Sequence, residues 1–120
     1  MTAKLEASNP RDIDDGVTVA GQISSDQVAE IAAAGYKTVV CNRPDHEGEA
    51  QPTAEEIGTA VEAAGMRFVY QPVVSGGMTI ENVQELAANL SAVEKPIFFY
   101  CRSGARSTQL YQTAKEIASR

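Results

Sequence analysis

The sequence predicts an α/β fold in three layers, with a mainly parallel central sheet and helices on both of its faces. Short runs of β-branched and aromatic residues, which are typical of buried strands, alternate four times with stretches whose apolar residues recur every three or four positions. Such alternation is typical of parallel sheets, because each connecting helix packs back onto the sheet. At 120 residues the chain is expected to form one domain, residues 1–120.

The first half of the chain is predicted to contain two strands and one helix. After a polar lead, Val17–Ala20 forms the first strand, and Ser24 opens the helix with Gln27 three residues later as a capping box. The next strand covers residues 36–41. A polar loop follows at 42–52, and its length indicates a functional or flexible segment, because most connections are shorter.

The second half repeats the alternation. A Gly-Gly loop separates the third strand from the helix that follows it, and a proline precedes the fourth strand. The predicted elements are a helix at 53–65 with a capping box of Thr53 and Glu56, a strand at 68–70, a helix at about 79–91, a strand at 97–100 and a final helix from about 106 to 118.

Composition limits the kinds of partner. The formal net charge of −6 disfavours nucleic acid and anionic membranes, because both require a basic surface. No apolar run approaches the ~20 residues that a membrane span needs, and the N-terminus lacks the apolar stretch of a signal peptide. We therefore expect a cytoplasmic protein with reduced thiols and with neither a membrane nor a nucleic-acid partner.

The segment with the clearest chemistry joins the last strand to the last helix. It places Cys101 at the carboxyl end of the strand, Gly104 in the turn and Arg106 at the start of the helix. In such a loop, successive backbone N–H groups form a concave anion site, to which the helix dipole and an arginine fork contribute. The same surroundings favour a thiolate over a thiol, so Cys101 can act as a nucleophile without a histidine base.

The candidate catalytic residues are therefore Cys101, as the nucleophile, and Arg106, which would bind the anion. Gly104 allows the backbone to turn its amides inward without a side-chain clash. Ser107 is expected either to hydrogen-bond the sulfur or to cap the helix. The other residues expected around the anion are Arg102, Ser103, Gly104 and Ala105 through their N–H groups, the Arg102 side chain at the mouth, and Gly76 and Gly77 as the opposite wall.

The loop Cys-Arg-Ser-Gly-Ala-Arg-Ser resembles the active-site loop of single-domain rhodaneses, in which a cysteine and an arginine enclose a ring of backbone amides that binds a sulfane sulfur. It is also similar to the loop of cysteine-dependent phosphatases. The phosphatase loop has five residues between cysteine and arginine, whereas four separate Cys101 from Arg106. The likeness implies either sulfur transfer or phosphate hydrolysis.

Further segments extend the resemblance over nearly the whole chain: Gly21-Gln22, Asn42-Arg43-Pro44-Asp45, Pro72-Val73-Val74, Tyr100-Cys101-Arg102-Ser103-Gly104 and Arg106-Ser107. Residues 13–22 and 34–45 are similar to the opening of dual-specificity-phosphatase-like domains. The chain resembles most the phosphatase-like domain of beta-lactamase-hydrolase-like proteins, a bacterial group often fused to or encoded beside sulfur dioxygenases. This resemblance implies a cysteine-phosphatase-like fold. Arg43, which resembles a fixed residue of the family, would either face the pocket as an anion-binding residue or form a structural salt bridge.

The two chemistries differ in their need for an acid. In cysteine phosphatases an aspartate on a neighbouring loop usually protonates the leaving oxygen. The corresponding loop here, residues 74–79, contains no Asp, Glu or His, and the sequence offers only Asp45 on the other long loop as a substitute. A thiolate that attacks a sulfane sulfur releases sulfite or a weakly basic thiolate without protonation. The sequence therefore favours a rhodanese-like sulfurtransferase acting through a Cys101 persulfide.

This function implies a small anionic sulfur donor such as thiosulfate or a persulfide, a thiol acceptor, and a sulfur dioxygenase or another sulfide-oxidising protein as partner. The alternatives are a cysteine-dependent phosphatase acting through a Cys101 phosphocysteine and a non-enzymatic persulfide carrier or binding module. Cys41 is interpreted as a buried core residue, with a resolving thiol as the alternative. His46 lies among acidic residues, but one histidine with scattered carboxylates does not predict a metal site, and no cofactor is expected.

Overall fold

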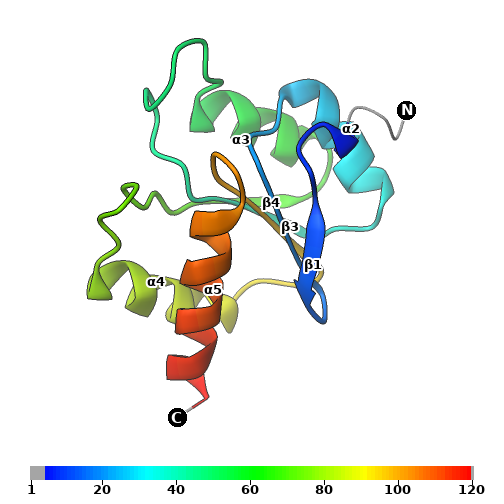
Figure 1. Cartoon of the computed structure of the whole chain (residues 1–120). Helices are drawn as coiled ribbons and strands as arrows, with labels where there is room; N and C mark the ends of the chain where they lie inside the picture. The colour runs from blue at the N-terminus through cyan, green and yellow to red at the C-terminus, as the bar shows by residue number, and fades with distance from the viewer. Residues whose placement is uncertain (1–4, 120) are drawn as a thin grey trace.

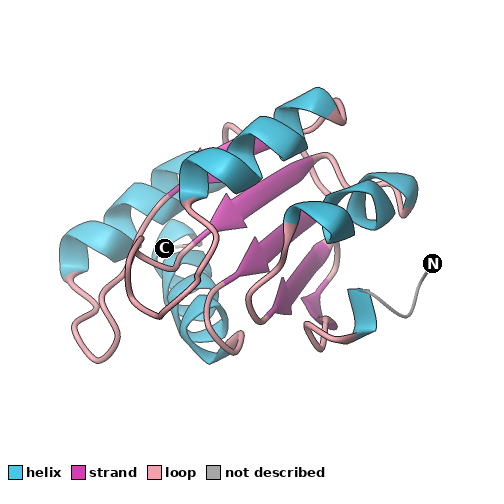
Figure 2. Cartoon of the chain, turned by 90° about the horizontal axis from the view of Figure 1, so that it is seen from above, coloured by secondary structure: helices cyan, strands magenta, loops and turns pink. Residues whose placement is uncertain are grey.

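The computed structural model describes residues 5–119 and has three layers, with a five-stranded sheet between two pairs of helices (Figures 1 and 2). The elements in chain order are β1 (Arg11–Asp14), β2 (Val17–Ala20), α2 (Ser25–Ala33), β3 (Thr38–Cys41), α3 (Ala54–Ala63), β4 (Arg67–Tyr70), α4 (Ile80–Leu90), β5 (Ile97–Tyr100) and α5 (Ala105–Ala118).

The sheet has the strand order β1-β2-β5-β3-β4. β5 lies at its centre and pairs in parallel with β2 and β3, so that Ile97 is in register with both Val17 and Thr38. β4 extends the parallel part, and β1 pairs antiparallel with β2 at the other edge. Every residue of β2, β3 and β5 is buried, as expected for parallel strands covered on both faces. The predicted three-layer fold with a mainly parallel sheet is confirmed.

The two faces of the sheet form separate cores. Along β5 the side chains alternate, because successive residues of a strand point to opposite faces. Phe98 and Tyr100 pack with residues of α2 and α3, whereas Ile97 and Phe99 pack with residues of α4 and α5. Burial of a large apolar side chain contributes roughly 1.5–3 kcal/mol, so β5 anchors both layers. The residue that leaves β5 at its carboxyl end is Cys101.

The strand β1 differs from the prediction, which placed a polar lead before β2. β1 reads Arg-Asp-Ile-Asp and carries no apolar run, so neither periodicity nor composition distinguishes it from a loop. It is an edge strand, paired through its backbone with β2 on one side. Backbone pairing with β2 and side-chain contacts such as the bond from Thr18 Oγ1 to Asp12 Oδ1 at 2.7 Å therefore hold this strand in place.

The predicted capping box is confirmed before α2, whereas α3 shows the Thr53 half of the capping box expected with Glu56. Gln27 Oε1 accepts the N–H of Ser24 at 2.7 Å before α2, and Thr53 Oγ1 accepts the N–H of Glu56 at 3.1 Å before α3. Thr79 forms a further capping box before α4. No helix in the described part of the chain is both long and apolar enough to cross a bilayer.

The parallel strands end together at one edge of the sheet. The loops that leave β3, β4 and β5 there cover residues 42–53, 71–79 and 101–104. In open parallel sheets this carboxyl edge is where ligands bind. All residues singled out from the sequence as candidate site residues lie in these loops or in the first turn of α5.

Candidate active site

Cys101 lies at the centre of the edge, buried at 1% exposure between the end of β5 and the start of α5. Its N–H donates to the carbonyl oxygen of Ala20 on the neighbouring strand at 3.2 Å, which continues the sheet into the loop. The N–H of Gly104 donates to Sγ of Cys101 at 3.0 Å. Gly104 has a φ of +96°, a left-handed conformation that favours glycine and turns its amide toward the sulfur.

The surroundings of Cys101 favour its thiolate. Burial raises the pKa of the thiol, but hydrogen bonds from the Ser107 side chain and from the N–H groups of Ser107, Ser103 and Gly104 lower it by more, so that the pKa falls below its ordinary value. The sulfur also lies at the N-terminus of α5, where a helix dipole stabilises negative charge. A larger fraction of Cys101 is therefore ionised at neutral pH than of a free thiol, and the thiolate is the form that acts as a nucleophile.

The predicted ring of amides is only partly turned toward the sulfur. Ser103, Gly104 and Ser107 contribute N–H groups to it, whereas the N–H of Ala105 donates to Ser103 Oγ at 3.3 Å. Arg102 is exposed, and its backbone carbonyl oxygen accepts the N–H of Gln22 at 3.3 Å.

Gly21, which belongs to one of the segments that resemble the phosphatase-like family, packs against the backbone of the cysteine loop. A Cβ atom on Gly21 would lie 2.9 Å from the carbonyl oxygen of Arg102, which is closer than real Cβ contacts allow. The residue must therefore be glycine for the backbone after β2 to approach the loop after β5.

Ser107 links the sulfur to a residue that the sequence did not single out as a site residue. Ser107 is fully buried, and its Oγ donates to Oδ1 of Asn42 at 2.8 Å. Asn42 is also buried, and its amide group is oriented by a 2.9 Å bond from Nδ2 to the carbonyl oxygen of Gln71. Because the hydroxyl has one proton, it can donate either to Asn42 or to the thiolate of Cys101. In either case the backbone N–H of Ser107 bonds the sulfur of Cys101.

Arg106 presents one edge of its guanidinium to protein acceptors. Nη1 donates to Glu47 Oε2 at 3.0 Å and to the carbonyl oxygen of Val73 at 2.9 Å, and Nη2 donates to Glu47 Oε1 at 3.0 Å. In the part of the chain that the structure describes, Nε and the second hydrogen of Nη2 have no acceptor. That free edge is a two-hydrogen fork that suits an oxyanion.

Arg43 contacts the same carboxylate as Arg106. Its Nε donates to Glu47 Oε1 at 3.0 Å and its Nη1 donates to Gln22 Oε1 at 3.1 Å. Arg43 thus forms the structural salt bridge that was the alternative. Burial raises the pKa of Glu47, but hydrogen bonds from Arg106 and Arg43 lower it by more, so this carboxylate stays ionised at neutral pH.

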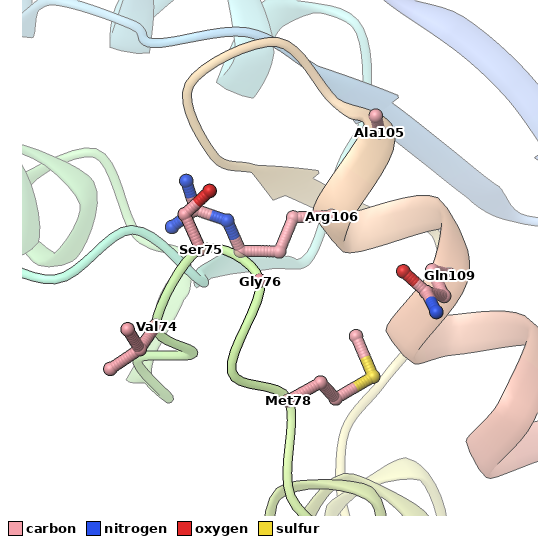
Figure 3. A pocket seen from close by; sticks show the side chains of 7 residues that line it. All are labelled: Val74, Ser75, Gly76, Met78, Ala105, Arg106 and Gln109. Atoms are coloured by element: carbon pink, nitrogen blue, oxygen red, sulfur yellow. The ribbon is translucent and has the colours of Figure 1, made fainter.

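A cleft of about 370 Å³ opens between the loop after β4 and the first two turns of α5 (Figure 3). It reaches the start of α5 at Ala105 and Arg106, and its lining does not include residues 101–104. Gly76 lines this cleft as expected, but Gly77 does not. The N–H of Gly77 instead closes a turn onto the carbonyl oxygen of Val74 at 2.9 Å, so of the two glycines expected as the wall only one takes part. The lining residues are Val74, Ser75, Gly76, Met78, Ala105, Arg106 and Gln109.

The cleft lining contains no carboxyl or imidazole group. Asp45, the substitute acid that the sequence offered, uses Oδ1 to accept the N–H of Ala54 at 2.7 Å at the start of α3. Its role is that of a helix cap. His46 is exposed, and among the described residues no group of three or more His, Cys, Asp and Glu side chains is placed to hold a metal ion.

Cys41 lies on the other face of the sheet. It is buried at 2% exposure in the core with α2 and α3, whereas the sulfur of Cys101 is hydrogen-bonded at the start of α5. Burial raises the pKa of the Cys41 thiol above its ordinary value, and its Sγ donates to the carbonyl oxygen of Arg43 at 3.4 Å. The prediction that Cys41 is a buried core residue is confirmed.

Solved structures with a similar fold are described as phosphatases or candidate phosphatases. A structure from Neisseria meningitidis Z2491, described as a candidate phosphatase, is 33% identical with a TM-score of 0.77, over 83% of this chain and 71% of that one. A kinase associated phosphatase, solved with its catalytic-site cysteine replaced by serine, is 11% identical with a TM-score of 0.63, over 73% of this chain and 57% of that one. The second likeness concerns the fold alone, which is that of cysteine phosphatases.

Sequence comparison gives the family. A beta-lactamase hydrolase-like protein of Xylella fastidiosa (strain Temecula1) is 28% identical over 109 residues, which cover 91% of this chain and 25% of the relative. The chain thus spans about a quarter of the curated relatives that it matches. Residues 9–118 match the family model described as "Beta-lactamase hydrolase-like protein, phosphatase-like domain". This chain therefore belongs to the family of phosphatase-like domains of beta-lactamase hydrolase-like proteins.

Proposed function

We propose that this chain is a cysteine-dependent phosphatase in which Cys101 is the nucleophile. The observation that carries the proposal is the hydrogen-bonded sulfur of Cys101 at the N-terminus of α5, a helix whose first turn also carries Arg106 with its free fork. The family match and the fold of the solved phosphatases support it. They favour hydrolysis of phosphate over the sulfur transfer that the sequence alone favoured, because the family model is described as a phosphatase-like domain and both solved structures are described as phosphatases or candidate phosphatases.

In the first step a phosphate monoester binds with its non-bridging oxygens on the loop N–H groups and on the free edge of Arg106. The thiolate of Cys101 attacks phosphorus, an S–P bond forms, and the bond from phosphorus to the ester oxygen breaks with its electron pair on that oxygen. Catalysis in such a step comes mainly from positioning and from donors aimed at the transferring oxygens. The leaving alcohol or phenol extends into the cleft between Ser75 and Gln109.

In the second step water attacks phosphorus and its protons remain on the inorganic phosphate, while the S–P bond breaks with its electron pair on sulfur and Cys101 leaves as a thiolate. Donors that stabilise the thiolate make it a better leaving group in this step. The hydroxyl of Ser107 can rotate from Asn42 to the sulfur for this purpose. Arg106 and the loop amides hold the phosphoryl oxygens throughout.

The cleft lining has no carboxyl or imidazole group to donate a proton, and this determines which esters react well. Without an acid, the leaving oxygen departs unprotonated, and a missing general acid costs about 10²- to 10⁴-fold for a poor leaving group. Asp45 caps α3 and the Glu47 carboxylate is bound by two arginines, so neither is free to donate a proton. We therefore expect aryl and acyl phosphates, whose leaving groups are weak bases, to be the substrates.

A rhodanese-like sulfurtransferase is the second candidate. The observations that favour it are the four-residue spacing between Cys101 and Arg106 and the cleft without an acid. In that reaction the thiolate attacks the sulfane sulfur of thiosulfate or of a persulfide, sulfite or a thiolate leaves, and a thiol acceptor then removes the sulfur from Cys101. A carrier without turnover would stop at the persulfide until a sulfide-oxidising partner took the sulfur.

Parallel assays separate these functions. Wild-type protein, Cys101→Ser and the control Cys41→Ala are each given p-nitrophenyl phosphate, and separately thiosulfate with cyanide. The phosphatase proposal predicts release of p-nitrophenol by wild type and Cys41→Ala but not by Cys101→Ser, with no thiocyanate. Hydrolysis that survives Cys101→Ser excludes the mechanism, and thiocyanate formation without hydrolysis favours sulfur transfer.

A further inference from the structure

Arg11 connects the edge strand β1 to the cysteine loop, although 92 residues separate it from Ser103. Its Nη2 donates to the carbonyl oxygen of Ser103 at 2.9 Å. Its Nη1 donates to the carbonyl oxygen of Asn9 at 2.8 Å, which fixes the other side of the guanidinium. Both acceptors are backbone atoms, so the contact requires the arginine and not a particular side chain on the loop.

The guanidinium of Arg11 lies directly against Gly104. A Cβ atom on Gly104 would lie 2.6 Å from Nη2, 2.8 Å from Nη1 and 2.9 Å from Cζ of Arg11. Real Cβ atoms do not make contacts that short. The space beside Gly104 is thus filled by Arg11, and the two residues fit together on the outer side of the loop.

The peptide that joins Ser103 to Gly104 has two polar ends. In a trans peptide the C=O and the N–H point in opposite directions. Arg11 binds the C=O of Ser103 on the outside, and the N–H of the same peptide donates to Sγ of Cys101 at 3.0 Å on the inside. Rotation of this peptide would turn a carbonyl oxygen toward the thiolate and would break the bond to Arg11.

We propose that Arg11 is a positioning residue of the candidate active site, which holds the Ser103–Gly104 peptide with its N–H turned toward the sulfur of Cys101. Arg11 acts through the backbone and does not touch the substrate. The inference rests on Cys101 as the nucleophile, the part of the proposed function that phosphate hydrolysis and sulfur transfer share. It adds a residue from the N-terminal edge strand to a site built from the loops after β3, β4 and β5 and from the start of α5.

Two substitutions test the role. Arg11→Met removes every donor, and Arg11→Lys keeps the charge but replaces the planar fork by an ammonium group. Arg67→Met is the matched control, because Arg67 lies on the other edge strand and its Nη1 likewise donates to a backbone oxygen, that of Ala92, at 3.2 Å. The readouts are the pH dependence of Cys101 alkylation by iodoacetamide and kcat and KM for p-nitrophenyl phosphate.

For Arg11→Met we expect the midpoint of the alkylation profile to rise by about one pH unit, because the thiolate loses a fixed donor. We expect kcat to fall roughly tenfold to 10²-fold, with a smaller change in KM. Arg11→Lys should lie between Arg11→Met and wild type, and Arg67→Met should match wild type.

Wild-type midpoints and kcat in both Arg11 variants would overturn the inference. If Arg11→Met does not fold, Arg11→Lys decides alone, since an upward shift of its alkylation midpoint supports the role and a wild-type profile contradicts it. If wild type hydrolyses no phosphate ester while the alkylation midpoint still shifts in the variants, the proposed function fails and the role of Arg11 stands.

Discussion

Arg106 and Glu47 form a bidentate ion pair in which Nη2 and Nη1 of Arg106 each lie 3.0 Å from a different carboxylate oxygen of Glu47. The pair is partly sheltered, with side-chain exposures of 11% and 22%. Glu47 binds one edge of the Arg106 guanidinium, and Arg43 Nε donates to the same carboxylate. These bonds hold the other edge of Arg106 in a fixed orientation. Glu47 therefore aligns the arginine that we expect to bind the transferring group.

We predict that Glu47→Gln lowers kcat/KM for p-nitrophenyl phosphate, by up to about 10²-fold, because an amide offers one acceptor where the carboxylate offers two and a small misplacement of a binding group is costly. Glu49→Gln, on the same loop and exposed, is the matched control and should leave the rate unchanged. A rate that rises in Glu47→Gln would contradict the aligning role and would mean that the carboxylate competes with substrate for Arg106.

The hydroxyl of Ser107 is predicted to set the reactivity of Cys101. Because the hydrogen bond from Ser107 helps to lower the pKa of Cys101, wild-type alkylation should reach half its maximal rate at a lower pH than a free cysteine does. In Ser107→Ala the midpoint should rise by about one pH unit. Thr113→Ala, which removes a hydroxyl elsewhere on α5 that donates to the carbonyl oxygen of Gln109, should leave the profile unchanged. An unshifted midpoint in Ser107→Ala would show that the backbone donors suffice.

The cleft without an acid leads to a prediction about substrates. A series of aryl phosphates with increasingly basic phenols should show kcat/KM falling steeply, and alkyl phosphates should react at least about 10²-fold more slowly than p-nitrophenyl phosphate. The measurement is a plot of log kcat/KM against the pKa of the leaving group. A flat plot would require a proton donor and would contradict the assignment of Asp45 as a helix cap.

Asp14 gives a prediction about stability and pH. Hydrogen bonds from Lys115 and Tyr111, each at 2.6 Å, hold the pKa of Asp14 far below its ordinary value of 3.8. A carboxyl group with a lowered folded-state pKa stabilises the fold above its unfolded-state pKa, and this contribution is lost as the pH falls through the folded-state value. Asp14→Asn should therefore unfold at lower urea concentration than wild type at pH 7.

The same reasoning requires the two urea midpoints to converge as the pH is lowered well below about 4. Urea titrations at several pH values, followed by circular dichroism, measure the difference. Midpoints that stay equally far apart at all pH values would mean that Asp14 acts through packing and not through its charge.

The core of the site could be predicted from the sequence because it is local. The apolar run of β5, the glycine loop and the periodicity of α5 are contiguous, and together they specify a strand, an anion loop and a helix N-terminus around Cys101. The three-layer fold follows from the same alternation along the chain. Local patterns were sufficient wherever one segment supplies both the structure and the chemistry.

The residues that orient this core could not be predicted in the same way. Asn42, Glu47 and Arg11 lie 65, 59 and 92 residues from the residues of the cysteine loop and the first turn of α5 that they contact. The parallel pairing of β3 with β5 and the edge strand β1 bring them close. The sequence pointed to Arg43 as a candidate anion ligand, but it does not reveal the carboxylate of Glu47 that Arg43 binds instead. Polar loop residues carry no periodicity from which their partners could be read.

The central claim, that Cys101 attacks phosphorus, is tested most directly by the intact mass of the protein quenched within the first turnover. Wild-type protein is mixed with p-nitrophenyl phosphate and, in parallel, with thiosulfate, and each sample is digested to locate any adduct. We predict the mass gain of one phosphoryl group on Cys101 with the phosphate ester, none in Cys101→Ser, and no added sulfur with thiosulfate. Added sulfur on Cys101 together with no phosphoryl adduct would contradict the claim.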